Sequence, residues 1–212
     1  MIKVFNFREY WSKEELALFD SLDSPRKIQD FLDNAKYNSS SDYYSPRSVI
    51  RLNKAHCFDG CLFAAAALRN LGYAPVIVEL FSNNDDVHFL AIYKIDGYFG
   101  AIAKSNCTGL RFREAVYKSL RELVMSYFHD YFNTIYEMTL RGYSSPINLK
   151  KFDKLNWMTS EAQLDIIANA SDSLKKYSII SPKQIKKLSR CDERIYKAGL
   201  LFSDPEGLYW AK

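Results

Sequence analysis

Residues 57–72 read CFDGCLFAAAALRNLG and predict the central helix of the fold. Alanine and leucine favour helix, and the run from Cys57 to Leu71 is apolar on nearly every face, which is typical of a helix that is buried all round. Gly72 suits the left-handed residue that often ends a helix. Cys57 therefore stands at the predicted N-terminus of a buried helix.

Strands are predicted directly after this helix. Residues 75–81 and 87–93 are rich in β-branched and aromatic residues, and a polar, turn-forming segment separates them. Asp96-Gly97 indicates a tight hairpin turn into a third strand, from Tyr98 to Ala103. The order predicts a helix followed by an antiparallel meander.

Helices are expected on both sides of this core. Ser12 and Ser24-Pro25 mark the starts of two short helices, and residues 37–46 form a polar, tyrosine-containing loop long enough to border a cleft. Apolar residues at helical spacing predict a further helix over 113–133. Shorter helices are predicted over 160–170 and from Ser181-Pro182 to Leu188.

The composition indicates a single α+β domain. The chain has 212 residues, of which 48% are hydrophobic, and this is enough to bury a real core. We expect the core at 55–106, a helical layer at 1–54 and a helical C-terminal extension at 107–212. The 29 Lys and Arg residues against 25 Asp and Glu residues leave a formal charge of +4, and so small a total does not support a nucleic-acid partner.

A cytoplasmic location is expected. Charged residues occur too early in the N-terminal segment MIKVFNFRE for the apolar stretch of a signal peptide, and no run reaches the length of a membrane span. The four cysteines should then be reduced, and they do not form a pair of CxxC motifs. No feature of the sequence indicates an oligomeric state.

Cys57 has the position of a reactive thiol. A helix N-terminus favours the thiolate through its free N–H groups and the positive end of the helix dipole. A nucleophilic thiol also needs an imidazole to take its proton and a third group to orient that imidazole. His88 on the second predicted strand suits the imidazole, with Asn106 or Ser105 as the third group.

Residues 55–106 resemble the core of transglutaminase-like proteins, which share the papain-like fold. In that core a cysteine opens a helix that ends in a Leu-Gly step, and the following strands supply a histidine and a carboxylate or amide. Here fifteen positions separate Cys57 from Gly72, as the pattern requires, whereas Cys61 does not fit it. A wider set of motifs, including GAIAKSN at 100–106, resembles a group of bacterial proteins and brings no reaction with it.

The resemblance implies roles for three residues. Cys57 matches the nucleophile and His88 matches the general base. The usual aspartate is absent, because Ala103 stands at its place, and Asn106 is the substitute, with Ser105 and Asp86 behind it. The family fold is a central helix packed on an antiparallel sheet, with flanking helices.

Two functions are therefore expected. The first is thiol-dependent acyl chemistry on an amide or ester, such as one in a peptide or protein substrate, with hydrolysis ahead of transfer to an amine. The second is a non-catalytic binding module that keeps the fold. We expect no metal or other cofactor, because the local set of His56, Cys57 and Cys61 provides at most three ligands where a structural zinc needs four. His56 is expected to cap and pack rather than to stabilise an oxyanion, and Lys104 is either an anion-binding group or solvated surface.

Overall fold

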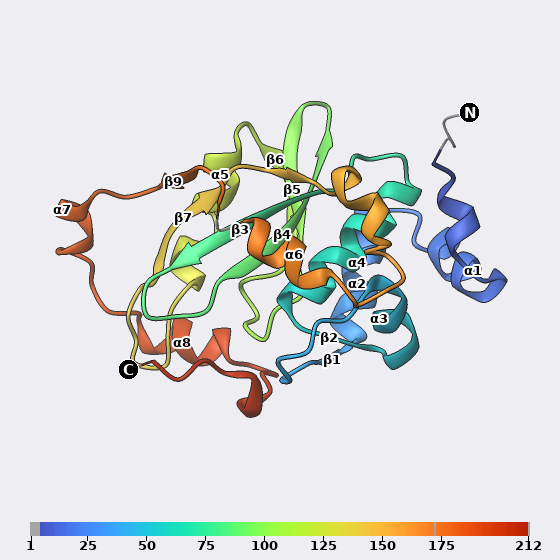
Figure 1. Cartoon of the computed structure of the whole chain (residues 1–212). Coiled ribbons are helices and arrows are strands. Elements are labelled where there is room, and N and C mark those ends of the chain that lie inside the picture. The colour runs from blue at the N-terminus through green and yellow to red at the C-terminus, as the bar shows by residue number, and fades with distance from the viewer. Residues whose placement is uncertain (1–4, 172, 212) are drawn as a thin grey trace.

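The computed structural model describes residues 5–171 and 173–211, and Figure 1 shows helices gathered against one central sheet. Met1 to Val4, which begin the segment used to argue against a signal peptide, lie outside the described residues. The sheet has seven strands in the order β6-β5-β4-β3-β7-β9, with β8 paired to β3. Its strands are β3 (Val76–Ser82), β4 (His88–Ile95), β5 (Tyr98–Ile102), β6 (Arg113–Tyr117), β7 (Leu140–Ser144), β8 (Ile147–Asn148) and β9 (Lys176–Ser178).

Every strand pair in this sheet is antiparallel, which confirms the α+β class and the predicted meander. The β4–β5 turn is a tight hairpin in which Asp96 and Gly97 both have positive φ, at 51° and 85°. This backbone is the one that an Asp-Gly pair adopts most readily. A separate parallel pair, β1 (Lys36–Tyr37) and β2 (Lys54–Ala55), lies beside the helices.

Helix α4 (Cys57–Asn70) is the centre of the fold, as the sequence predicts. Its residues from Phe58 to Leu68 are all buried, and Gly72 follows it with φ of 89°. Three helices pack around it: α1 (Lys13–Ser21), α2 (Pro25–Asn34) and α3 (Pro46–Leu52). Ser12 and Ser24 cap α1 and α2 as predicted, because each hydroxyl accepts a backbone N–H of the first turn.

The two faces of the sheet bury separate cores. One face carries Phe89, Ala91 and Tyr93 of β4 toward α4. The opposite face carries Leu90 and Ile92 into a second core that also contains the apolar side of α5 (Leu120–Met125). This alternation follows from the two-residue period of a strand, and it determines which side of β4 each functional residue can reach.

The prediction of one helix over 113–133 is wrong. Residues 113–117 form β6, α5 is short, and a 3-10 turn, η2 (Phe128–Asp130), follows. The apolar residues in this stretch fit both periods, and strand pairing of Arg113 with Ala101 selected the strand. Ser119 then begins the helix by accepting the N–H of Glu122.

The C-terminal extension is also less helical than predicted, because it supplies four strands of the sheet. Its helices are short: α6 (Leu164–Ala170) begins later than predicted and α7 (Pro182–Ile185) ends earlier. The remaining elements are α8 (Glu193–Gly199) and the 3-10 turns η1 (Phe7–Tyr10), η3 (Leu149–Leu155) and η4 (Pro205–Gly207). None of the helices within 5–171 and 173–211 combines the length and apolarity needed to cross a membrane.

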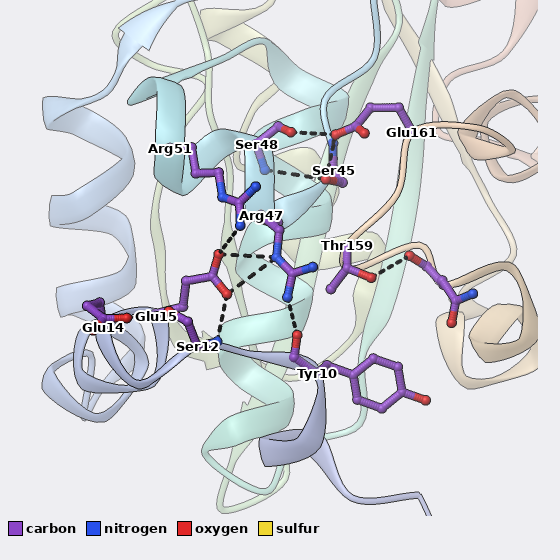
Figure 2. A network of polar contacts seen from close by, with 11 residues as sticks. Tyr10, Ser12, Glu14, Glu15, Ser45, Arg47, Ser48, Arg51, Thr159 and Glu161 are labelled. Carbon is purple, nitrogen blue, oxygen red and sulfur yellow. Dashed lines mark hydrogen bonds and ion pairs between the residues drawn. The ribbon is translucent and has the colours of Figure 1, made fainter.

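A polar network fixes α3 to its neighbours (Figure 2). The buried carboxylate of Glu15 in α1 accepts from Arg47 at 3.1 Å and lies 3.3 Å from Arg51. Glu161 accepts from the backbone N–H and hydroxyl of Ser45 and from the hydroxyl of Ser48. These contacts join α1 and the segment before α6 to the helix that leads into α4.

Gly60 provides the close approach between α4 and the end of β5. A Cβ at position 60 would lie 2.3 Å from Cβ of Lys104, an atom next to the backbone that cannot swing away. Gly60→Ala is therefore expected to lower the free energy of unfolding by about 2 kcal/mol, the typical cost of overpacking. Inside a helix, replacing Gly by Ala usually raises the free energy of unfolding. Urea denaturation measures whether the free energy of unfolding falls or rises. A more stable Gly60→Ala would contradict the close contact between positions 60 and 104.

Candidate active site

His56 caps the N-terminus of α4. Its Nδ1 accepts the backbone N–H groups of Phe58 at 3.1 Å and Asp59 at 3.4 Å. Because Nδ1 accepts, the neutral ring carries its proton on Nε2, which lies 3.5 Å from a carboxylate oxygen of Asp59. Burial lowers the pKa of His56 to about 4. The residue therefore caps and packs, as expected.

Asp59 completes this cap and is missing from the sequence-based set. Its carboxylate is fully buried and accepts three N–H groups, from the backbone of His56 at 3.1 Å, the backbone of Tyr44 at 2.8 Å and the side chain of Asn38 at 3.4 Å. Burial raises the pKa of Asp59 to about 7. Asp59 holds the 37–46 loop against the start of α4. A capping residue followed three positions later by an acid, as in His56 and Asp59, is the sequence pattern that could have identified Asp59.

Cys57 lies at the first position of α4 and is partly buried. Its thiol donates to the carbonyl of Val87, with Sγ 3.8 Å from the oxygen. Burial, together with the nearby Asp86 and Asp59, raises the pKa of the thiol to about 12, although hydrogen bonds from the backbone N–H groups of Phe58 and Phe89 favour the thiolate. At neutral pH the resting group is therefore a thiol.

His88 begins β4 and is only 4% exposed. Its Nε2 lies 2.8 Å from the carbonyl oxygen of Leu110. A carbonyl can only accept, so Nε2 carries the proton and Nδ1 is left as a base. Burial lowers the pKa of His88 to about 4. The bond to Leu110 opposes this shift, and the charge of Arg113 adds a smaller lowering effect. The ring is neutral and its tautomer is fixed.

One cavity brings the predicted residues together. Cys57, His88 and Asn106 all line it, along with Ser105 and Asp86. The thiol and the imidazole reach the cavity from different sides of β4. Side chains alternate along a strand, so Phe89 points toward α4, whereas His88 lies on the opposite face of the sheet, together with Leu90. Within the described residues no hydrogen bond joins Cys57 to His88, since each bonds to a backbone carbonyl instead.

Asn106 does not orient the imidazole of His88, which is the role predicted for it, but binds the backbone of Asp204. Its Nδ2 donates to the carbonyl of Asp204 at 2.8 Å, and its Oδ1 accepts the N–H of Asp204 at 2.7 Å. The bond that orients His88 comes from the Leu110 carbonyl. Ser105, the other predicted neighbour, accepts the backbone N–H of Cys107 at 2.9 Å. A main-chain carbonyl can come from any residue type, so no sequence signal marks Leu110.

Lys104 is not an anion-binding or solvated group, and both expectations for it are wrong. It is buried, and its ammonium donates to the carbonyls of Leu32, at 2.8 Å, and Ala35 at the C-terminal end of α2. Burial lowers its pKa to about 8. Lys104 therefore caps a helix rather than facing the cavity. Across 5–171 and 173–211, no cluster of three or more His, Cys, Asp or Glu side chains could hold a metal ion.

Residues 12–105 match the family model described as a transglutaminase-like domain. The match contains both Cys57 and His88 and extends from the predicted core back over α1, α2 and α3. No curated protein matches the chain. Residues 12–105 are therefore similar to a transglutaminase-like domain, which supports an assignment to the transglutaminase-like superfamily.

Proposed function

We propose that this domain performs thiol-dependent acyl chemistry on an amide or ester, with Cys57 as the nucleophile and His88 as the general base. The observation that carries the proposal is the shared cavity, which is lined by a thiol at a helix N-terminus and by a neutral imidazole whose Nδ1 is unprotonated. The N–H groups of Phe58 and Phe89 favour the thiolate. Because the N–H of Phe58 also donates to His56, the N–H of Phe89 is the one suited to hold developing negative charge. A peptide or protein amide fits this chemistry.

The reaction has two stages. In the first, Nδ1 of His88 takes the thiol proton while Sγ of Cys57 attacks the carbonyl carbon and forms a tetrahedral oxyanion. Collapse breaks the bond to the amine or alcohol, which leaves with the proton from His88, and a thioester remains on Cys57. In the second, water loses a proton to His88 and attacks the thioester, which releases the carboxylic acid and returns the proton to sulfur. We propose this hydrolysis in preference to transfer of the acyl group to an amine.

The resting protein needs rearrangement before this chemistry. A thiol with a pKa of about 12 and an imidazole with a pKa of about 4 do not exchange a proton while they stay apart. Direct contact changes both values, because a thiolate beside an imidazolium stabilises each charge. Substrate binding is proposed to bring Cys57 and His88 together.

A non-catalytic binding module is the second candidate. It is favoured by the same two backbone contacts: the thiol bonds to Val87 and the imidazole bonds to Leu110, so both are satisfied without each other. In that case the cavity binds a ligand and Cys57 remains a protonated thiol throughout.

Hydrolysis of p-nitrophenyl acetate separates the two functions. Cys57→Ser is expected to reduce turnover to the buffer rate, and His88→Gln is expected to lower it by about 10²- to 10⁴-fold, the usual contribution of a general base. Cys107→Ser is the matched control, because Cys107 is another thiol of the same cavity. An acetyl group located on Cys57 by peptide mass spectrometry supports catalysis. Turnover at the buffer rate in the wild type and in Thr134→Val, which loses its bonds to the C-terminal segment beside Cys57, would establish the binding module, provided that iodoacetamide labels Cys57 equally in wild type and His88→Gln.

A further inference from the structure

The C-terminal segment Asp204–Ala211 passes beside the thiol. Two cavities meet at Cys57, one containing His88 and the other containing His56. Gly207, Leu208 and Tyr209 line both of them, so this segment runs between the two cavities that Cys57 lines. In Figure 1 the red chain leaves α8, reaches β1 and β2, and turns back across the same edge of the molecule.

Three contacts hold the segment in place. Asn106 bonds to both backbone groups of Asp204 at one end. Thr134 accepts the N–H of Ala211 at 3.2 Å and donates to the carbonyl of Tyr209 at 3.4 Å at the other end. Between them Gly207 lies against Tyr37, where a Cβ would come within 2.5 Å of the ring.

The backbone before the segment is strained. Phe202 has φ of 64° and is 96% exposed, so a bulky residue adopts the left-handed conformation with no packing of its own side chain to offset the cost. Steric conflict between Cβ and the backbone disfavours this conformation in any residue other than glycine. Release of the segment would let this position relax, so Phe202 is suited to act as a hinge.

We propose that Asp204–Ala211 is an autoinhibitory strap, which fills the substrate cleft beside Cys57 and must leave before an acyl substrate can enter. The proposal rests on the proposed function for the identity of the substrate. Opening of the strap also frees both polar atoms of Asn106, and Asn106 shares the β5–β6 connection with Leu110, whose carbonyl orients His88. A shift of the strap is therefore proposed to act on the backbone that orients His88.

Site-resolved alkylation of Cys57 by iodoacetamide tests the strap without requiring turnover. Thr134→Val keeps the side-chain shape and removes two hydrogen bonds, so the rate at Cys57 is expected to rise about 5- to 30-fold, from about 1 kcal/mol for each net hydrogen bond lost. Gly207→Val should raise it further by collision with Tyr37. Thr159→Val is the matched control, because Thr159 bonds only locally to Asn156 and leaves the strap intact.

Two further results complete the test. A synthetic peptide of residues 204–211, added to folded Thr134→Val, is expected to return the labelling rate toward the wild-type value. Labelling that is unchanged in Thr134→Val, or that the peptide fails to slow, overturns the strap. If labelling responds as expected while p-nitrophenyl acetate is not hydrolysed by any variant, the strap stands and the catalytic proposal fails. If the wild type hydrolyses the ester through Cys57 while labelling is unchanged in Thr134→Val, the strap fails and the catalytic proposal stands.

Discussion

Asp59→Ala is expected to lower the free energy of unfolding by about 4 kcal/mol, since it leaves three N–H donors without their acceptor at roughly 1 to 3 kcal/mol for each buried group. The donors belong to His56, Tyr44 and Asn38, so the loss removes the cap of α4 and the anchor of the 37–46 loop together. A loss of this size is a large part of the stability of an ordinary domain. Urea denaturation monitored by circular dichroism measures it.

Asp59→Asn is the control for this prediction. The amide keeps the shape of the side chain and one accepting oxygen, so the loss should be clearly smaller than for alanine. Equal losses in the two variants would mean that the negative charge, rather than the hydrogen-bond geometry, stabilises the start of α4. No measurable loss in Asp59→Ala would contradict the buried cap altogether.

His88→Gln is expected to remove a pH dependence of stability worth on the order of 3 kcal/mol, which is the free energy of a shift from about 6.5 in the unfolded chain to the folded value. The folded pKa of His88 is about 4. Between these two values the unfolded chain binds a proton that the folded protein does not. The stability that neutral His88 provides is therefore full above pH 6.5 and is lost as the pH falls toward 4.

Comparing wild type with His88→Gln isolates the contribution of His88 to the pH dependence of stability. His56, with a pKa lowered to about 4, and Asp59, with a pKa raised to about 7, also titrate in this range and act in opposite directions, but both are present in wild type and variant. Glutamine can still donate to the Leu110 carbonyl and carries no charge at either pH. The unfolding free energy of wild type minus that of His88→Gln should therefore fall by about 3 kcal/mol from pH 7 to pH 4. A constant difference would mean that His88 is accessible to protons in the folded state.

The central part of the fold follows from local signals. The apolar run after Cys57, the left-handed stop at Gly72 and the Asp96-Gly97 turn each depend on residues close in sequence, and all three are confirmed. The helix predicted over 113–133 depended on apolar spacing alone. There, pairing with β5 across the 103–112 connection decided the conformation, and a partner strand leaves no trace in the local pattern of apolar residues.

The site shows the same division. The sequence identifies the two chemically distinctive residues of the cavity, Cys57 and His88, and the structure places both in it. It could not identify the carbonyl of Leu110, which has no side-chain signature, or the contact between Asn106 and Asp204, which are far apart in the chain. Side-chain chemistry was visible in the sequence, whereas partners supplied by the backbone and by remote segments required coordinates.

The four alanines in the middle of α4 have a consequence for how this sequence can vary. Residues 64–67 are at most 1% exposed, so methyl groups set the distance between this helix and everything around it. Any larger side chain there must push a neighbour away, and glycine would weaken the helix. Random mutagenesis should therefore leave this block nearly unchanged among folded survivors, while Val116, which is 62% exposed on β6, should accept many replacements.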